Sequence, residues 1–400
     1  MKKNTADVVV LGAGAAGLMA AATAGYAGKK VVLLDHTDKP GKKILMSGGG
    51  RCNFTNLNTT PANFVSANPH FCISALKRYS PQHFVELVER HGVDYVEKGP
   101  GQLFCAGKSK EILDVLLTEA DWAGVDIRMQ TAIERVETTA DSVCLQTSTG
   151  RLDAGALVVA TGGLSIPTLG ASGFGYDLAR QLGLKVWPTR AGLVPFTLHP
   201  ELKAHLAPLS GLSAEVEASC RGVHFKEPLL ITHRGLSGPA ILQLSSYWQP
   251  GDQISINWLP DFRLNEELRQ LRQTSPRSSL NTWLAEQLPK RLAATLMTLL
   301  EIQTGTLPER LADWSNNQLE AASEYLQKWT FTPAGTEGYR TAEVTLGGVD
   351  TQAISSRDFS VKSLPQIRFI GEVLDVTGQL GGYNFQWAWA SGVAAGQGLA

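Results

Sequence analysis

The chain has 400 residues, more than one hydrophobic core usually serves, so we expect two or three domains. Its 36 basic and 37 acidic side chains leave a formal charge of -1, which argues against a nucleic-acid partner and against an acidic membrane surface. Five cysteines without a CxxC pair argue against a disulfide framework and fit a cytoplasmic location.

The N-terminus offers one rival interpretation. Lys2-Lys3 and the apolar run that follows to Ala27 resemble a secretory signal peptide. Regularly spaced glycines interrupt that run, and a second apolar strand completes a folded unit after it. No stretch reaches the roughly twenty uninterrupted apolar residues of a membrane span. We therefore expect a mature N-terminus within the fold and no membrane span.

The first thirty-five residues carry the clearest pattern. Asp7–Leu11 reads as a buried strand, Gly12–Gly17 as a tight turn that opens an Ala-rich helix, and Val31–Leu34 as a second strand that ends on Asp35. Strand, glycine turn, helix, strand and acid in this order are typical of a βαβ unit that binds a dinucleotide. A glycine-rich turn without a ligand is the alternative.

Each residue of this turn has an expected role. Gly12 permits the tight turn, Gly14 lets the backbone approach a pyrophosphate, and Gly17 lets the helix pack closely on the strand. Ala15 and Ala16 would present the free N–H groups of the helix N-terminus to the phosphates. The carboxylate of Asp35 would accept the hydroxyls of the adenosine ribose.

Further along, the periodicity predicts three helices and then short strands. The helices are expected near His70–Tyr79, Pro81–His91 and Lys108–Ala123. The strands are expected at Asp126–Val136, Val143–Thr147 and Ala156–Ala160, and a late strand at Ile367–Gly371 should rejoin the first sheet.

These elements predict an α/β protein with a Rossmann-like domain formed by both chain ends. Residues 1–192 would form the first part of that domain and residues 344–400 its second part. Alternating β-branched segments predict a β-rich, barrel-like inserted domain at residues 193–262, with a return at residues 329–343. Residues 263–328, with Leu and Ala at helical spacing, predict a helical domain.

The N-terminal unit alone does not separate NAD from FAD, but three further segments favour FAD. Thr161-Gly162 follows an apolar strand and could lie against the middle of a dinucleotide. The run Pro40–Asn53 offers glycines, lysines and an arginine that suit a pyrophosphate and a flat ring. Gly371-Glu372 would bring a carboxylate to a ribityl chain, and Gly381–Asn384 would aim a helix N-terminus at the flavin. A plain Gly-Gly helix cap is the alternative for that last segment.

These segments, together with His233–Pro239 and Thr345–Val349, make the chain resemble the YhiN-like flavoprotein family, which also includes aminoacetone oxidase and the bile-acid-pathway flavin reductase BaiN. The resemblance covers essentially the whole chain. It implies non-covalent FAD, a split FAD-binding domain, an inserted β-barrel-like domain and a helical domain. The stretch Asp358–Lys362 departs from the family's usual pattern, which puts any substrate contact there in doubt.

The resemblance also implies roles for single residues. Lys43, Gly49 and Arg51 would line the cofactor, and the backbone of Ile133 would meet the adenine. Glu372 and Asn384 would meet the ribityl chain and the ring. With the residues above, the expected FAD-binding set is Gly12, Gly14, Ala15, Ala16, Gly17, Asp35, Lys43, Gly49, Arg51, Ile133, Thr161, Gly162, Gly371, Glu372, Gly382, Tyr383 and Asn384.

No catalytic residue is identified. His233, Arg340, Glu343 and Tyr383 are candidates, although a structural histidine, an ion pair between strands or a helix start would explain them as well. Cys52 could be a redox thiol, but a packed thiol is favoured because no partner cysteine is near it in sequence. No His, Cys, Asp or Glu spacing indicates a metal site.

The glycine-rich segment at residues 170–175 lacks the following strand and acid of a second nucleotide-binding unit, so NAD(P)H would bind only transiently as electron donor. The sequence therefore predicts a cytoplasmic FAD-dependent oxidoreductase with a small-molecule substrate, passing electrons to an organic acceptor or oxygen. A non-catalytic or regulatory FAD-binding protein is the main alternative. An RNA-modifying flavoenzyme is a third, against which the balanced charge argues.

Overall fold

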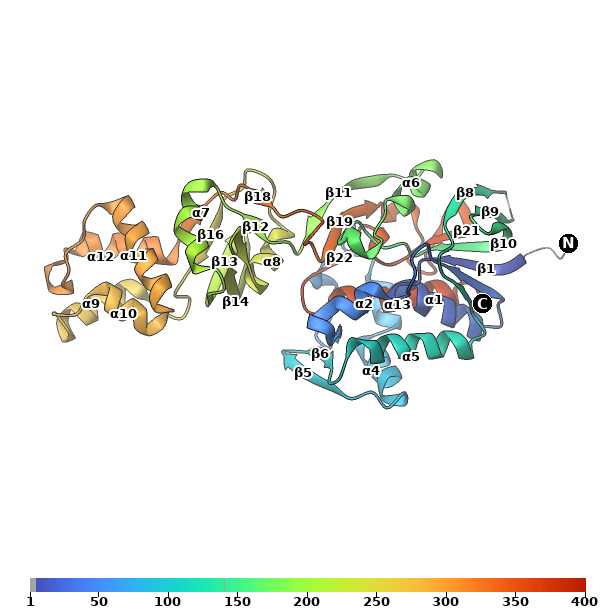
Figure 1. Ribbon diagram of the computed structural model, residues 1–400, viewed down its shortest axis with the longest axis horizontal. Coiled ribbons are helices and arrows are strands. Elements are labelled where there is room, and N and C mark those ends of the chain that lie inside the picture. The colour runs from blue at the N-terminus through green and yellow to red at the C-terminus, as the bar shows by residue number, and fades with distance from the viewer. Residues whose placement is uncertain (1–4, 140) are drawn as a thin grey trace. The chain divides into compact units, whose positions relative to one another are not determined.

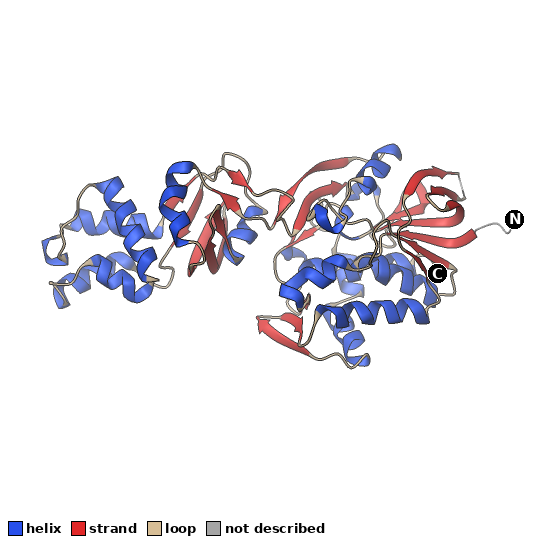
Figure 2. Cartoon of the chain, in the orientation of Figure 1, coloured by secondary structure: helices blue, strands red, loops and turns tan. Residues whose placement is uncertain are grey.

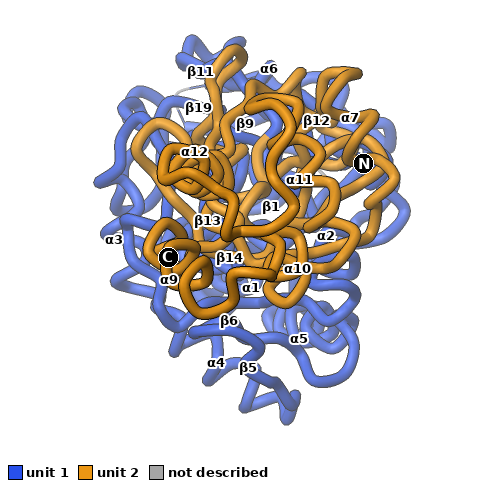
Figure 3. The backbone as a smooth tube through the Cα atoms, turned by 90° about the vertical axis from the view of Figure 1, so that its left-hand side faces the viewer, with its two compact units in different colours: residues 1–191, 343–400 blue, residues 192–342 orange. Residues whose placement is uncertain are grey.

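The computed structural model describes residues 5–139 and 141–400. They form two compact units, one of residues 1–191 and 343–400 and the other of residues 192–342 (Figure 3). The first unit thus contains both chain ends. The five-segment domain division made from the sequence stays a prediction.

The first unit is built on a mostly parallel sheet with the strand order β20-β21-β10-β1-β2-β7. These strands are β1 (Thr5–Leu11), β2 (Val31–Leu34), β7 (Asp126–Arg128), β10 (Gly150–Val159), β20 (Ser360–Val361) and β21 (Leu364–Phe369). Strand β1 pairs in parallel with β2 and β10, and β10 pairs in parallel with β21. The predicted Rossmann-like α/β class is confirmed, and the late strand does rejoin the first sheet.

Helices cover the sheet where its central strands are apolar and buried, as at Val8–Leu11 of β1 and Leu157–Val159 of β10. Figures 1 and 2 show α1 (Ala15–Tyr26), α5 (Ser109–Trp122) and α13 (Tyr383–Gln397) on one face, with α6 (Phe174–Gln181) on the other. Strand β2 is buried at every position, as expected for a strand covered on both sides.

Smaller elements complete the first unit. Its other helices are α2 (Lys42–Met46), α3 (Ile73–Arg78) and α4 (Pro81–Arg90). Its other strands are β3 (Asn53–Asn56), β4 (Phe64–Val65), β5 (Tyr95–Gly99), β6 (Gln102–Cys105), β8 (Ile133–Thr138), β9 (Val143–Thr147), β11 (Val186–Gly192), β19 (Val344–Val349) and β22 (Thr377–Gly378).

One predicted strand was wrong. The single strand expected at Asp126–Val136 is two strands, β7 and β8, that pair with different neighbours. Gln130 between them adopts a left-handed φ of 55°, and its N–H donates to the carbonyl of Thr37 at 2.9 Å. The apolar alternation continues through this turn, so periodicity alone did not reveal it.

Helices α1 and α13 approach each other closely through small residues. A Cβ atom added at Gly392 would lie 2.7 Å from the carbonyl oxygen of Ala16, and one added at Gly396 would lie 2.5 Å from Cβ of Thr23. Because successive positions of α13 meet successive positions of α1, the two helices run parallel. Their N-termini therefore point toward the same end of the unit.

Buried hydrogen bonds tie α13 to the N-terminal half of the chain. The indole of Trp389 donates to the carbonyl of Phe54 at 2.8 Å. The side chain of Gln386 accepts from the hydroxyl of Thr55 at 2.7 Å and donates to the carbonyl of Tyr79 at 2.8 Å. These bonds leave no buried amide atom of Gln386 without a partner, which fixes the rotation of α13 about its axis.

The second unit has one sheet and a set of helices around a continuous apolar core. The seven strands follow the order β17-β16-β13-β14-β15-β12-β18. They are β12 (Phe196–Thr197), β13 (Ser213–Cys220), β14 (Val223–Ile231), β15 (Gly235–Ser237), β16 (Ile254–Asn257), β17 (Trp329–Phe331) and β18 (Gly335–Thr336). The helices are α7 (Pro200–Leu206), α8 (Pro239–Ser245), α9 (Leu264–Thr274), α10 (Leu280–Gln287), α11 (Lys290–Thr304) and α12 (Asn316–Gln327).

The close approach of α1 and α13 predicts the effect of Gly392→Ala. Alanine in a helix interior normally stabilises by about 1 kcal/mol relative to glycine. Here its methyl group would meet backbone, so we expect a destabilisation of about 1–3 kcal/mol and a lower melting temperature by circular dichroism. Gly14→Ala, where an added Cβ meets no atom within 4 Å, is the control, and all three proteins are melted as apoproteins because Gly14 belongs to the predicted FAD site. Unchanged melting of Gly392→Ala would show that the helices are not in this contact.

Candidate functional site

The glycine turn after β1 has the close packing that its sequence predicted. Gly12 adopts a φ of 108°, and a Cβ atom there would lie 2.4 Å from the carbonyl oxygen of Ala160. A Cβ at Gly17 would lie 1.9 Å from the carbonyl oxygen of Gly12. Gly14 differs, because its φ is an ordinary -88° and a Cβ there would meet no atom within 4 Å. Gly14 thus faces open space at the N-terminus of α1.

The N-terminus of α1 can accept an anion. Ala15 and Ala16 begin α1, and its first turn carries no acidic residue. Unpaired N–H groups and the dipole at a helix N-terminus favour an anion. The open space beside Gly14 and the free helix end together suit a pyrophosphate.

Asp35 holds the turn in shape. One carboxylate oxygen accepts the N–H of Ala13 at 2.8 Å, and the other accepts the N–H of Thr37 at 2.8 Å. The N–H of Thr131 donates to the carbonyl of Asp35 at 2.9 Å, which brings the chain before Ile133 to the same end of β2. The residues predicted for ribose and adenine are therefore neighbours.

Lys43 and Glu372 form an ion pair across most of the chain. The ammonium of Lys43 lies 2.8 Å from one carboxylate oxygen of Glu372 and 2.5 Å from the hydroxyl of Ser165. The other oxygen of Glu372 accepts the N–H of Thr345 at 2.9 Å and the hydroxyl of Ser165 at 3.3 Å. Both predicted residues thus belong to one network. The sequence did not single out Ser165, and it placed Thr345 only in a family motif.

The turn after β10 adjoins this network. A Cβ at Gly163 would lie 2.8 Å from a carboxylate oxygen of Glu372. The hydroxyl of Thr161 is buried, and within the described ranges 5–139 and 141–400 it has no hydrogen-bond partner. A Cβ at Gly162 would meet only Glu372, at 3.9 Å. Gly371 lies close by, since a Cβ there would be 2.9 Å from Cβ of Ala16.

The glycine run between α2 and β3 also borders open space. A Cβ at Gly49 or Gly50 would meet no atom within 4 Å. Arg51 follows as an exposed side chain that makes no ion pair with any described residue. An uncompensated cation beside an open glycine backbone fits the role of lining a phosphate or a flat ring.

The turn before α13 positions the helix N-terminus. Gly382 adopts a φ of 96°, and a Cβ there would lie 2.5 Å from the carbonyl oxygen of Thr55, so only glycine fits. Tyr383 begins the helix, half-buried, with its ring edge-on to Phe64. The amide of Asn384 bonds both backbone groups of Gly378 at 2.8 Å. These bonds already occupy both ends of the Asn384 amide. Contact of this side chain with FAD stays a prediction.

The candidate catalytic residues lie in different units. His233 and Arg340 are exposed residues of the second unit. Glu343 belongs to the first unit, where its carbonyl accepts the hydroxyl of Ser165 at 3.1 Å. Part of the Glu343 side chain is exposed to solvent. Desolvation by the surrounding protein nevertheless raises the pKa of its carboxyl, and the positive charge of Lys43 partly offsets this rise.

Cys52 is a packed residue. Its side chain is fully buried at a left-handed φ of 47°, and burial raises the pKa of the thiol to about 12. A thiol protonated at neutral pH is a poor nucleophile. The environment favours the packing role.

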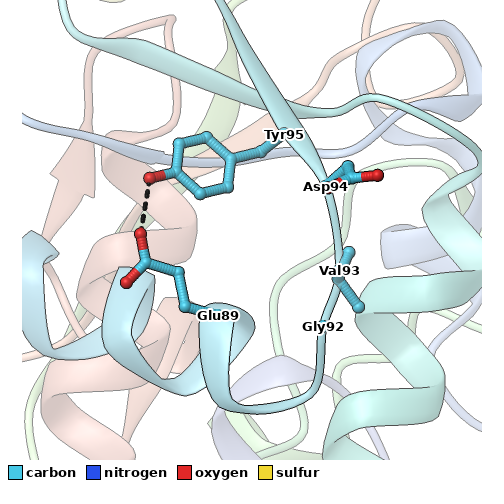
Figure 4. Close-up of a pocket in the computed structure, with 5 residues that line it drawn as sticks. All are labelled: Glu89, Gly92, Val93, Asp94 and Tyr95. Carbon is cyan, nitrogen blue, oxygen red and sulfur yellow. Dashed lines mark hydrogen bonds between the residues drawn. The ribbon is translucent and has the colours of Figure 1, made fainter.

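Two surface hollows lie elsewhere in the first unit. One, of about 310 Å³, is lined by Glu89 and Gly92–Tyr95, with Tyr95 donating to Glu89 at 2.8 Å (Figure 4). The other, of about 820 Å³, lies among α1, α4 and α5 and includes Trp122. Neither is lined by a predicted site residue.

These observations fit FAD. The groups at this site are a helix N-terminus, a carboxylate acceptor at the end of β2, a buried hydroxyl at Thr161 without a partner among the described residues, and glycine backbone that faces open space. Of the first unit's predicted residues, Gly14, Asp35, Ile133 and Thr161-Gly162 gather at the carboxyl ends of β1, β2 and β10, where doubly wound folds bind dinucleotides. Fold and site define a flavoprotein of the Rossmann type.

The chain belongs to the HI0933-like protein Rossmann domain family, whose model matches residues 6–398. It is 50% identical over 395 residues to the ribosomal RNA dihydrouridine synthase of Escherichia coli, covering 98% of each chain. The Haemophilus influenzae enzyme of that name is 47% identical, with 96% of each chain covered. The 3-dehydro-bile acid delta(4,6)-reductase of Clostridium scindens is 27% identical, with 98% of each chain covered.

Solved structures share the fold at low identity. The 3-ketosteroid-delta4-(5alpha)-dehydrogenase of Rhodococcus jostii RHA1 superposes with a TM-score of 0.51 at 14% identity, over 98% of this chain and 97% of that one. A quinol-fumarate reductase gives a TM-score of 0.51 at 14% identity, over 100% of this chain and 71% of that one. The chain has the fold of flavin-dependent oxidoreductases. Among the described residues no helix is long and apolar enough to cross a membrane.

The geometry of the glycine turn predicts that Gly14→Val and Asp35→Ala both weaken FAD binding. Valine would fill the open space at the helix end without a clash in the apoprotein. Alanine at position 35 would remove the acceptor of two N–H groups and loosen the turn. We expect each change to raise the Kd for FAD at least tenfold and so to lower flavin occupancy after purification. The Gly14→Val apoprotein should melt at the same temperature as the parent apoprotein. Full occupancy in the absorbance spectrum would contradict this site.

The burial of Cys52 predicts that it resists alkylation. In the native protein at pH 8 we expect iodoacetamide to leave Cys52 unmodified, and unfolding in guanidinium to expose it. Peptide mass spectrometry reads both states. Rapid native modification of Cys52 would favour the redox-thiol alternative instead.

Proposed function

We propose that this protein reduces uridine to dihydrouridine in ribosomal RNA, with FAD as its cofactor and NAD(P)H as a transient electron donor. The observation that carries the proposal is the 50% identity, across 98% of both chains, with a relative named for this activity. The proposal departs from the sequence expectation of a small-molecule substrate and no nucleic-acid partner. It keeps the expected cytoplasmic location, where ribosomal RNA is made and used.

The reaction adds two hydrogen atoms across the C5–C6 double bond of uracil. Uridine, NAD(P)H and a proton give dihydrouridine and NAD(P)⁺, so electrons and atoms balance. FAD, when bound, supplies the hydride transfer chemistry. The protein must hold the cofactor, admit the base and deliver a proton.

The names of two relatives share a reaction class. The bile-acid relative is a reductase of double bonds that a 3-keto group activates, and the uracil C5–C6 bond is likewise conjugated with a carbonyl. This common chemistry supports a reductase rather than an oxidase. It also supports reduction of a polarised double bond over other uses of a flavin.

Several side chains of the first unit suit these tasks. The predicted FAD-binding residues would hold the cofactor, with Lys43 and Glu372 bridging the two ends of the chain beside it. Glu343 and Tyr383 are the proton-donor candidates of this unit. Burial raises the pKa of the Glu343 carboxyl, which favours the protonated form that a proton donor requires. His233 and Arg340 stay candidates on the second unit.

The net charge of -1 does not exclude RNA, because it averages over the whole chain. Arg51, Lys98 and Lys108 are exposed around β6, and within the described part of the chain none of them forms an ion pair. Lys98 lies 4.7 Å above the ring of Phe104. Cations without acidic partners favour contact with phosphates.

The test is dihydrouridine formation by the purified protein. Ribosomal RNA from cells that lack this gene would be incubated with the FAD-loaded protein and NAD(P)H, and its nucleosides analysed by mass spectrometry. We expect one or a few uridines per RNA to gain two hydrogen atoms, with Gly14→Val as the cofactor-free control. A 3-keto steroid with 4,6 double bonds, added in a parallel reaction, tests the bile-acid type of substrate.

Other outcomes would contradict the proposal. Flavin that NAD(P)H bleaches and air restores, without any dihydrouridine, would indicate an oxidoreductase with another acceptor. FAD that no donor reduces would favour the non-catalytic alternative.

A further inference from the structure

The small antiparallel sheet β3-β6-β5 meets both glycine turns of the predicted flavin site. A Cβ added at Gly48 would lie 3.1 Å from the ring of Phe104 on β6. Two residues before Phe104, on the same face of the strand, Gln102 lies beside the other turn. A Cβ at Gly381 would be 3.1 Å from Cδ of Gln102. The side chain of Gln102 is therefore at the N-terminus of α13.

Gln102 is paired with Asn53, whose amide lies 3.0 Å away. The amide nitrogen of Asn53 is best directed at the carbonyls of Leu103 and Thr55, each at 3.2 Å, and its oxygen at Gln102. Asn53 then has its partners within the protein. With Asn53 turned this way, its oxygen would face the amide oxygen of Gln102 at 3.0 Å, so the amide of Gln102 must be turned as well. In that orientation Gln102 donates one N–H to Asn53 and keeps its second N–H and its carbonyl oxygen.

Those remaining groups of Gln102 have no other partner among residues 5–139 and 141–400. The side chain is half-buried, so a ligand can reach it. A side-chain amide with one donor and one acceptor side by side complements a ligand that offers an acceptor beside a donor. A cyclic imide, in which a carbonyl adjoins an N–H, is such a ligand.

We propose that Gln102, oriented by Asn53, recognises a cyclic imide at the N-terminus of α13. Two molecules in the proposed function carry this group: the pyrimidine ring of FAD and the uracil of the substrate. If the imide is that of FAD, the proposal requires only that the protein binds FAD. If the imide is the uracil of the substrate, the proposal rests on the proposed function. The first turn of α13 holds no acidic residue, so its dipole would favour negative charge on an imide oxygen.

The test replaces Gln102 with leucine, which keeps the size and removes both polar groups, and compares FAD with N3-methyl-FAD in the apoprotein by fluorescence quenching. If Gln102 binds the flavin, methylation should raise the Kd of the parent about tenfold and leave that of Gln102→Leu unchanged. Gln102→Glu, which lacks the N–H donor, checks that the effect does not come from poor folding. Gln146→Leu, at an exposed position of β9, is the control.

The second arm uses the loaded enzyme and ribosomal RNA. If Gln102 binds uracil, both variants should bind FAD and N3-methyl-FAD like the parent, while kcat/KM for dihydrouridine formation falls about tenfold. Unchanged behaviour of Gln102→Leu in both arms would overturn the inference even if the parent makes dihydrouridine. Because the first arm needs no RNA, it shows whether Gln102 binds the flavin even if the parent proves inactive on RNA.

Discussion

The parallel packing of α1 and α13 is the constraint on which the first unit depends. Gly392 and Gly396 let the two helices approach to backbone contact. Their positive ends then point the same way, an arrangement that costs electrostatic energy unless negative charge lies nearby. One end faces the open space at Gly14, and the other begins at Gly382. An anionic dinucleotide bound at these ends would offset this cost.

A second long-range contact is an ion pair between two side chains. The Lys43–Glu372 pair joins residues 329 positions apart, and Glu372 also accepts the backbone N–H of Thr345. Both charged groups keep partial exposure, 35% for Lys43 and 20% for Glu372, so the pair alone adds little stability. Its effect is to fix the position of two side chains at the site, at a point where four separate chain segments, those of Lys43, Ser165, Thr345 and Glu372, meet.

Local signals made the βαβ unit and the start of α13 predictable, since glycine spacing and strand alternation act over a few residues. The long-range partners were not predictable. Lys43 and Glu372 were each placed at the cofactor, yet nothing in their neighbourhoods shows that they pair. Asn53 and Gln102 read as ordinary polar residues until the sheet brings them together. Net charge says little about single surfaces, because a total of -1 averages over exposed cations such as Arg51 and Lys98 that form no ion pair with any described residue.

The relatives suggest which part of the site is general and which is selective. Reduction of a double bond conjugated with a carbonyl develops negative charge on the carbonyl oxygen, whether the substrate is a uracil or a 3-keto bile acid. A helix N-terminus such as that of α13 can stabilise this charge in either substrate. An N–H beside the carbonyl exists only in the imide, so the acceptor atom of Gln102 has a substrate partner only when the substrate is a pyrimidine. If Gln102 does not bind the flavin, it is the residue at which a uracil reductase would differ from a steroid reductase with the same fold.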